Sequence, residues 1–563
     1  MIKIFSPILL GLLIMTSCKK RDFLEQTVTN TLNEESVFTD SARTMDALVG
    51  IYDDIGNFAA HNRFSTSGLA AASDEAESSL QGGGAEFIKW ATGSISAINT
   101  NNDVWPVCYA NIRSVNVFLK NISRSPLSAP LKERVSGEAR FLRAWYYFQL
   151  VKHFGGVILV GDNIYNPDDA LPGKRNTYEE CVNYITSECD ATANILPLVH
   201  LSQDYGRITK GACLALKSRI LLYAASPLFN GGQVATDAQL KIVTGYAAAD
   251  NQRWLKAALA AEDVQNLNAY QLSEDNVTAA GFGFYRVFPL RKNTEYILAK
   301  MLPLNKDLET FYDPSSRSGS ANAFPYQELV DDFGMKNGKP ITDPTSGYNP
   351  ADPYTNRDPR LAYSVLYNGG LRMDRNTKKR TPVYTYTGSP DGGSKTGYYV
   401  LKMLDSASIN VAGFPSTQRC FPLIRYAEIL LNRAEALNEF QGPTTVVYDL
   451  VSAIRKRAGL VPFQLPAGLT QDQMRQRIRN ERRIELAYEE HRFWDVRRWK
   501  IAEQTDNRVL NGMQVTRLAN GTFTYKVIPV RQHSFRPGMY LFPIPQSEIN
   551  KSADGSLLQN PGW

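Results

Sequence analysis

The chain of 563 residues carries a formal net charge of +6, and 43% of its residues are hydrophobic and 21% charged. A chain of this length and ordinary globular composition forms one large domain or two closely associated domains. No cluster of lysine and arginine stands apart from acidic residues, so the charge pattern does not predict nucleic-acid binding.

The N-terminus predicts a secretory signal peptide over residues 1–17. Lys3 supplies a short positive region, and the apolar run Ile4–Met15 is too short to span a bilayer comfortably. Two small polar residues then precede Cys18, an order similar to a bacterial lipobox. We therefore expect residues 18–32 to contain a lipidated cysteine, Cys18, followed by a tether. An ordinary signal peptide with an incidental cysteine is the alternative.

The other five cysteines form no CxxC pattern, and an odd number cannot all pair within one chain. Two of them, Cys181 and Cys189, recur at helical spacing, which favours core packing. Disulfides are compatible with the sequence but not required by it. The five are Cys108, Cys181, Cys189, Cys213 and Cys420.

Apolar periodicity predicts a helical N-terminal domain over residues 33–270. Its strongest helix covers Glu138–Gly156, where apolar residues surround the helix and two glycines end it. Consecutive helices with short connections and alternating small and large apolar residues are typical of a tetratricopeptide-like solenoid. Further helices are expected over Asn33–Tyr52, Tyr178–Leu196, Gly206–Asn230 and Trp254–Leu267.

Residues 271–563 are expected to form a C-terminal domain of different character. From about residue 281 to residue 416 the chain is rich in Gly, Ser, Pro, Asn, Asp and Tyr, which predicts ordered loops and short strands. Helices return between about residues 425 and 500, and an extended tail with several prolines follows. The expected helices are Arg425–Glu439, Val446–Ala458 and Met474–Arg498. The predicted fold class is mostly α, with tetratricopeptide-like helical repeats packed against an irregular loop-rich half with short strands.

Several longer segments stand in a definite order along the chain. They are EARFLRAWYYFQLVKHFGG from Glu138, GRITKGACLALKSRILLY from Gly206, FPYQELVDDFGMKNGKPI from Phe324, NRDPRL from Asn356, RYAEILLNRAEALNE from Arg425, AIRKRAGL from Ala453, NERRIELAYEEHRFWDVRRWK from Asn480, LFPIPQSEIN from Leu541 and the terminal QNPGW. Together they resemble the SusD/RagB family of outer-membrane nutrient-binding lipoproteins. Their order, with the lipobox-like start, makes the resemblance specific.

The resemblance implies a binding protein and not an enzyme. It implies a lipid anchor in the outer membrane, a position facing the exterior, and a SusC-like TonB-dependent transporter as partner. The implied cargo is an oligo- or polysaccharide that is delivered to this transporter. No cofactor is expected. No twelve-residue calcium loop is present. The sequence does not decide whether a structural calcium ion binds in the Asp- and Asn-rich loops.

The sequence contains no clear catalytic or metal-binding pattern. None of its five histidines lies at metal-ligand spacing on a helix, and no G-x-S-x-G elbow or P-loop is present. Two carboxylates within Glu481–Lys500 could serve a glycosidase. Local pairing within one helix is the favoured interpretation, because acidic and basic side chains lie three residues apart there. The expected pairs are Glu489–Arg492, Arg492–Asp495 and Asp495–Arg498.

A glycan site needs aromatic side chains that stack on sugar rings and polar side chains that pair with hydroxyl groups. Such groups usually lie on loops held by a rigid scaffold. In the first half, the resemblance points to the segment Ser73–Trp105, with Asp74, Trp90 and Asn101 as expected ligand-binding residues. For Trp90, burial in the core is the competing interpretation.

A second candidate site in the loop-rich half consists of Phe282, Tyr285, Arg286 and Tyr296. Its competing interpretation is a β-hairpin with aromatic side chains paired across two strands. A weaker third candidate is a group of tyrosines around NRDPRL, where prolines favour a role in fixing loop geometry. These tyrosines are Tyr348, Tyr354 and Tyr363.

Three classes of function compete. The leading one is a glycan-binding lipoprotein that works beside a transporter. A helical-repeat scaffold, or a binder of another nutrient such as peptide, would share the solenoid but bind no glycan. A secreted glycoside hydrolase would place two isolated carboxylates in one cleft.

Overall fold

The computed structural model describes residues 34–65, 67–80, 82–101, 104–165, 169, 172–232, 234–552 and 555–563. The expected signal peptide, Cys18 and the tether lie outside these residues. The described chain is mostly helical, with short strands in two-stranded sheets, which confirms the predicted fold class.

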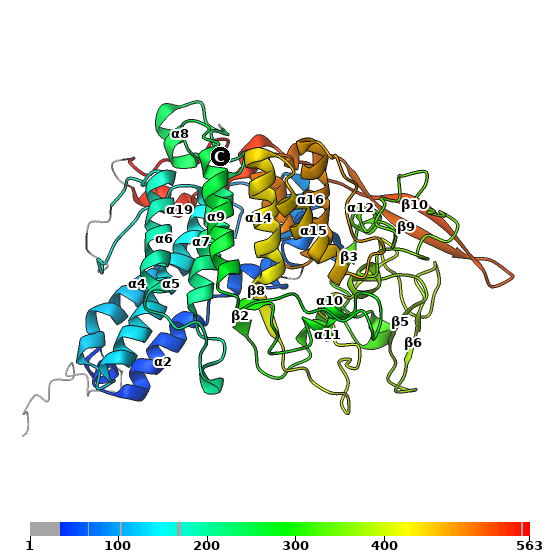
Figure 1. The fold of residues 1–563 in the computed structure, drawn as a ribbon, viewed down its shortest axis with the longest axis horizontal. Coiled ribbons are helices and arrows are strands. Elements are labelled where there is room, and N and C mark those ends of the chain that lie inside the picture. Colours follow the sequence, from blue (N-terminus) through cyan, green and yellow to red (C-terminus); the bar gives the residue numbers. More distant parts are fainter. Residues whose placement is uncertain are drawn as a thin grey trace, which may run out of the picture.

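The long helices form one continuous row in which each helix packs on the next (Figure 1). In packing order they are α4 (Val104–Asn121), α5 (Ala129–Phe154), α6 (Tyr178–Ala193), α7 (Lys210–Ala225), α9 (Gln252–Asn266) and α14 (Tyr426–Gln441), which contacts both α15 (Thr445–Arg457) and α16 (Gln471–Glu485). The chain between α9 and α14 is thus a large insertion into a single helical row.

Local sequence explains where these helices begin and how deeply they lie. In α6 the Thr177 hydroxyl accepts from the Glu180 backbone N–H at 3.1 Å, and the Glu180 carboxylate accepts from the Thr177 N–H at 2.7 Å. Helix α5 has apolar residues all round its surface, and Tyr146 and Tyr147 are fully buried. The short helix α2 (Ser41–Tyr52) packs on α4 and α5 at the first end of the row, and the short helix α1 (Glu34–Phe38) packs on α2.

The expected helix Asn33–Tyr52 is divided, because Asp40 caps α2 by accepting a hydrogen bond from the Arg43 N–H at 2.9 Å. Helix α4 was not expected from the sequence, because it begins at Val104, inside the segment Ser73–Trp105 that was considered as a binding loop. Two short helices, α3 (Glu86–Thr92) and α8 (Ala238–Thr244), complete this half.

The loop-rich half contains short helices and five antiparallel strand pairs. The helices are α10 (Phe282–Arg286), α11 (Asp307–Tyr312), α12 (Gln327–Asp332) and α13 (Leu361–Ser364). The pairs are β1 (Ala76–Ser78) with β3 (Ala323–Pro325), β2 (Tyr296–Met301) with β8 (Cys420–Arg425), β4 (Val365–Leu366) with β7 (Tyr399–Val400), β5 (Gly370–Met373) with β6 (Arg380–Val383), and β9 (Val509–Arg517) with β10 (Phe523–Gln532). The β9–β10 hairpin was not expected from the sequence and projects from the body (Figure 1). The short helix α19 (Gln546–Lys551) interrupts the proline-containing tail that was expected to be extended.

The long helix expected over Met474–Arg498 is broken into α16 and α17 (Arg492–Arg498). Between them Tyr488 and Glu490 adopt left-handed backbone conformations, with φ of 59° and 64°. The break carries Glu489 away from the helix axis, and its carboxylate pairs with Arg425 (Oε2–Nε, 2.6 Å). Sequence periodicity continues through this segment, so it could not reveal contacts made by residues from other parts of the chain.

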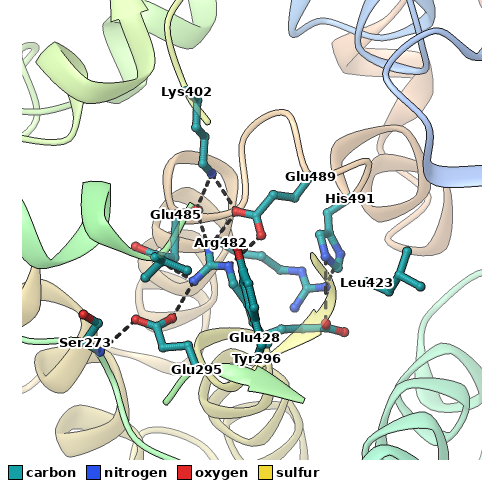
Figure 2. A network of polar contacts seen from close by, with 12 residues as sticks. Ser273, Glu295, Tyr296, Lys402, Leu423, Glu428, Arg482, Glu485, Glu489 and His491 are labelled. Atoms are coloured by element: carbon teal, nitrogen blue, oxygen red, sulfur yellow. Dashed lines mark hydrogen bonds and ion pairs between the residues drawn. The ribbon is translucent and has the colours of Figure 1, made fainter. Parts of the chain in front are cut away.

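Buried ion pairs join the helical row to the loop-rich half. Figure 2 shows Glu295, Glu485 and Glu489 converging below Lys402. Arg425 lies among the three carboxylates, at 2.8 Å from Glu485 and 3.1 Å from Glu295, and Lys402 contacts Glu489 at 2.7 Å. These side chains are buried, so the charges are fully paired inside the fold.

This network corrects the pairs expected within Glu481–Lys500. Only the Asp495–Arg498 pair forms locally, at 2.7 Å. Glu489 pairs with Arg425 and Lys402, and Arg492 pairs with Asp74, so the other two expected pairs are wrong. The cluster is structural all the same, because its carboxylates are buried against arginines.

The five cysteines after Cys18 are all buried, and Cys181, Cys189, Cys213 and Cys420 are free thiols. No helix in the described part of the chain is long and apolar enough to cross a membrane. Within the same residues, His, Cys, Asp and Glu side chains form no group of three that could hold a metal ion.

A candidate ligand pocket in the loop-rich half

A pocket of about 190 Å³ opens between α10, α13, the β5–β6 hairpin and the loop at residues 401–406. Three half-buried aromatic side chains line it, Phe282, Tyr285 and Tyr363. The described residues that line this pocket include no carboxylate, histidine or cysteine. An aromatic pocket of this composition is suited to binding and lacks the groups of a hydrolase.

The short helix α10 is fixed in place by the N-cap residue that precedes it, Gly281. Its φ is 70°, and a Cβ atom there would lie 2.9 Å from the carbonyl oxygen of Ala458. The Gly281 N–H donates to the Asn276 side chain at 2.7 Å, and Asn276 in turn donates to the Lys456 carbonyl at 2.9 Å. Glycine allows this close approach, so α10 is held against the end of α15.

The three rings form a continuous aromatic wall. The centroids of Phe282 and Tyr285 are 5.5 Å apart, and the Tyr285 ring stacks on Tyr363 at 5.7 Å with an interplanar angle of 23°. The Tyr285 hydroxyl donates to Ser406 Oγ at 3.0 Å and accepts from the Ser406 backbone N–H at 3.0 Å. The wall is therefore preorganised, which lowers the entropic cost of binding a ligand.

Three arginines lie in or beside the pocket, and they differ in their partners. Arg372 is buried and donates from Nε and Nη2 to the two oxygens of Asp313, at 2.6 and 2.8 Å, so its charge is neutralised. Arg380 is exposed and donates one hydrogen bond, to the Leu371 carbonyl at 3.4 Å. Arg286 is half exposed and contacts Asp275 at 3.5 Å.

Burial raises the pKa of Tyr363, and the nearby charge of Arg380 offsets part of this rise. The phenol therefore stays neutral at physiological pH and can donate a hydrogen bond. Together with the Ser406 hydroxyl and the arginines, it supplies polar groups at the edge of an apolar surface. This combination suits a sugar, whose ring faces are apolar and whose edge carries hydroxyl groups.

Comparison with known proteins establishes the family of the chain. A family model described as "SusD family" matches residues 271–563, and a second model, described as "Starch-binding associating with outer membrane", matches residues 22–222. The chain belongs to the SusD family. It is therefore a member of a family of binding proteins associated with the outer membrane, as the sequence resemblance implied.

Individual relatives share this fold over nearly their whole length. A SusD-like protein from Bacteroides fragilis has a TM-score of 0.77 and 29% identity, with 94% of this chain and 98% of that chain covered. A SusD-like carbohydrate binding protein from the same species has a TM-score of 0.72 and 24% identity, covering 92% and 99%. The SusD-like protein P2 of Formosa agariphila is 24% identical over 98% of both chains.

Within this SusD-family fold, the pocket brings together two of the expected residues, Phe282 and Tyr285. Arg286 follows Tyr285 at the end of α10 and lies beside the pocket without lining it. All three lie on a helix, so the competing interpretation of a β-hairpin is wrong. Tyr363, from the weaker third group, joins them. Tyr296 does not, because it lies on β2, only 8% exposed, beside the buried ion pairs (Figure 2).

The candidate residues of the N-terminal half do not form an open site. Asp74 is fully buried and pairs with Arg483 and Arg492. Trp90 is 1% exposed and its ring lies 4.2 Å from that of Phe542, so it offers no face to a sugar. The competing interpretation of Trp90 as a core residue agrees with this packing.

Asn101 is exposed, and its backbone N–H donates to Glu86 at 3.1 Å. The same Glu86 accepts from Trp90 Nε1 at 3.2 Å and from the Thr100 hydroxyl at 2.7 Å. Glu86 therefore closes a helix-and-turn unit around α3 by accepting from the Asn101 backbone, the Trp90 ring and the Thr100 hydroxyl.

Sequence reasoning missed the residues that the β5–β6 hairpin and the 401–406 loop add to the pocket. They are Leu371, Arg372, Arg380, Leu401, Leu404 and Ser406. The stretch DRNTKKR, residues 374–380, was a usable signal, because it combines turn-forming residues with a local excess of positive charge.

Proposed function

We propose that this protein is a cell-surface, lipid-anchored glycan-binding protein that captures oligo- or polysaccharide and delivers it to a SusC-like TonB-dependent outer-membrane transporter. The observation that carries the proposal is the aromatic wall of Phe282, Tyr285 and Tyr363, open to a pocket whose described lining includes no carboxylate, histidine or cysteine. Stacked aromatic faces with polar groups at their edge are the chemistry that sugar rings require.

The family comparisons support this proposal. One matching family model is described as starch-binding and associating with the outer membrane. Two proteins of the same fold are named as a SusD-like carbohydrate binding protein and a laminarin binding SusD-like protein, the second with a TM-score of 0.64 and 20% identity. We extend carbohydrate binding from these proteins to this chain as part of the proposal.

The lipid anchor and the transporter rest on the sequence. In the proposal, residues 1–17 are removed on export, Cys18 carries the acyl chains, and the tether to residue 32 lets the protein reach the transporter from the outer face of the membrane. Tethering two partners raises their effective concentration, so the cargo can be passed on without tight binding to either protein.

Binding to a glycan panel tests the proposal. A soluble form beginning at residue 19 is titrated with neutral and acidic polysaccharides by calorimetry, together with its Phe282→Ala and Tyr363→Ala variants. Loss of one stacking ring should weaken binding about tenfold, since an aromatic contact contributes about 0.5–1.5 kcal/mol beyond the area that it buries. Tyr165→Ala, at a partly buried tyrosine of the helical half, is the control and should leave affinity unchanged.

Two outcomes would contradict the proposal. If no glycan binds, peptide or another nutrient becomes the cargo, or the protein is a scaffold. If glycan binds but the control weakens it as much as the pocket variants do, the site lies elsewhere. Membrane fractionation of full-length protein and its Cys18→Ala variant tests the anchor separately, and co-purification of the full-length protein with a TonB-dependent transporter tests the partner.

A further inference from the structure

The β5–β6 hairpin presents a dense positive charge beside the pocket. Its turn and the start of β6 carry four exposed cations within six residues, Arg375, Lys378, Lys379 and Arg380. The acidic residue in the same stretch, Asp374, accepts from the Asn376 and Thr377 N–H groups and faces Arg317 at 3.8 Å. Asp374 is thus used to shape the turn. We call residues 374–380 the basic hairpin.

The charges of the basic hairpin are not neutralised within the described part of the chain, where none of the four cations forms an ion pair. Arg380 uses one N–H group on the Leu371 carbonyl at 3.4 Å, and its other donors remain available. Exposed cations of this kind repel one another at short range, so a cluster without acidic partners is more favourable when an anion lies beside it.

The base of the basic hairpin is rigid, although its tip is exposed. Arg372 on β5 is anchored by Asp313, and Arg317 donates to the Thr381 hydroxyl at 3.0 Å and to the Pro382 carbonyl at 3.1 Å. Arg380 lies opposite Met373 in the strand pair, at the point where the hairpin meets the pocket. The backbone that carries Arg380 is therefore held beside the aromatic wall.

The pocket itself has the same sign of charge. Its described lining contains Arg380 and the paired Arg372 but no carboxylate. Beside it, Arg286 is 46% exposed and contacts Asp275 at 3.5 Å, so Arg380 is the lining cation without an acidic partner among the described residues. A pocket for a neutral sugar usually places carboxylates or amides against the hydroxyl groups, because these accept hydrogen bonds. Here the exposed polar groups are mainly donors, which match a ligand with anionic acceptors.

We infer that the pocket takes an acidic glycan, one whose sugar rings stack on Phe282 and Tyr363 while a carboxylate or sulfate substituent pairs with Arg380. Neighbouring acidic residues of the polymer then lie along Lys378, Lys379 and Arg375. A guanidinium group donates two parallel hydrogen bonds to a carboxylate or sulfate, which gives specificity as well as affinity. This inference rests on the proposed function and names the chemical class of its ligand.

Matched polymers separate charge from sugar identity. Polygalacturonate is compared with fully methyl-esterified pectin, and dextran sulfate with dextran, by calorimetry on the soluble chain at low and high salt. We expect each acidic polymer, or one of the two, to bind at least tenfold more tightly than its neutral counterpart. The two arms distinguish a carboxylate from a sulfate ligand. The preference should decrease with added salt, since exposed charges are screened.

Variants then locate the charge effect. Arg380→Gln should weaken binding of the preferred acidic polymer about tenfold, and Lys378→Gln with Lys379→Gln should weaken it further, without unfolding because these side chains are exposed. The control with the same net charge is Lys120→Gln with Lys256→Gln, at two exposed lysines of the helical half, and it should bind as the unchanged protein does.

Three results would overturn the inference. In the first, neutral polymers bind as tightly as acidic ones, and Phe282→Ala weakens both, which leaves the proposed function standing. In the second, the control double variant weakens binding as much as the basic-hairpin variants do, which indicates non-specific attraction between a basic protein and a polyanion. In the third, no polymer binds, and the proposed function fails together with the inference.

Discussion

Arg492 donates two hydrogen bonds to the carboxylate of Asp74, from Nε to Oδ1 at 2.7 Å and from Nη2 to Oδ2 at 2.8 Å. The two residues are 418 positions apart, and both side chains are buried. Burial alone would raise the pKa of Asp74, but the charges of Arg483 and Arg492 outweigh it and hold the pKa well below its usual range. This pair fastens the N-terminal helical half to the segment that follows α16.

Removal of one partner should therefore destabilise the whole protein. Arg492→Ala leaves the Asp74 carboxylate buried with fewer partners, and we expect a loss of about 3–5 kcal/mol in the free energy of unfolding. Arg508→Ala is the matched control, since Arg508 faces the same carboxylate at 3.9 Å but is 44% exposed. Arg508→Ala should lower the free energy of unfolding by less than about 1 kcal/mol. Urea unfolding measures both, and equal losses would refute the structural role of the buried pair.

Trp90 gives a test that separates stability from binding. Its ring is buried against Phe493, Phe542 and Trp563, so Trp90→Ala should cost about 3–5 kcal/mol of stability. The affinity of the folded fraction for glycan should not change, because the ring does not reach the pocket. If the variant stays folded at low temperature but binds glycan more weakly, Trp90 contributes to the binding site and this prediction is wrong.

Much of the helical row could be predicted from the sequence, because its helices carry a complete local signal. Helix α5, which was expected over Glu138–Gly156, and the helices near Tyr178 and Arg425 combine apolar periodicity with caps or terminal glycines. The break after Glu485 could not be predicted in this way. It is stabilised by distant partners, such as the Tyr488 N–H donating to Glu75 at 3.3 Å, and these leave no periodic trace.

The residue types of the candidate site could be predicted from the sequence, but only some of the residues that form it could. Phe282 and Tyr285 are close in sequence, so composition alone could mark them as an aromatic group. Tyr363 and Ser406 join them only through the fold, from segments about 80 and 120 residues away. Conversely, Asp74 and Trp90 have the residue types of a sugar site, and only packing shows that the core uses them.

The Tyr285 hydroxyl should control the order of the 401–406 loop. Tyr285→Phe keeps the stacking ring but removes the acceptor of the Ser406 N–H, so the Ser406 amide should exchange with solvent faster. The loss of stability should be about 0.5–1.5 kcal/mol. Ser406→Ala keeps the hydrogen bond from the backbone N–H of residue 406 to the Tyr285 hydroxyl. The exchange rate of this amide should therefore change less than in Tyr285→Phe. Hydrogen–deuterium exchange measures both, and a larger effect from Ser406→Ala would refute this assignment.

Two buried carboxylates should make the protein acid-sensitive. Burial alone would raise the pKa of Glu435 and of Glu485, but paired arginines, Arg498 for the first and Arg457 for the second, hold each pKa at about 2. A carboxylate with a depressed folded-state pKa stabilises the protein above its unfolded value of 4.5, and this stability is lost as the pH falls from 4.5 towards 2. Urea midpoints should drop steeply over this window, and Glu435→Gln should make the drop shallower.

Two other buried carboxylates have the opposite effect on how the stability of the fold depends on pH. Burial, with the charge of Asp74, raises the pKa of Glu75 to about 7, and burial, with the charge of Glu75, raises that of Glu490 to about 8. Such groups stabilise the fold while protonated, so their contribution is complete below pH 4.5 and is lost as the pH rises through 7 and 8. Stability should therefore be greatest in mildly acidic solution.

Glu490→Gln isolates this second effect, because glutamine resembles the protonated carboxyl group and cannot ionise. The variant should match the unchanged protein near pH 5 and exceed it at pH 8.5 by an amount of the order of 1–3 kcal/mol. Its remaining acceptor oxygen can still receive the Leu69 N–H, which donates to Glu490 at 3.2 Å. Equal destabilisation at both pH values would mean that the hydrogen-bonding geometry of Glu490, and not its ionisation, determines its effect on stability.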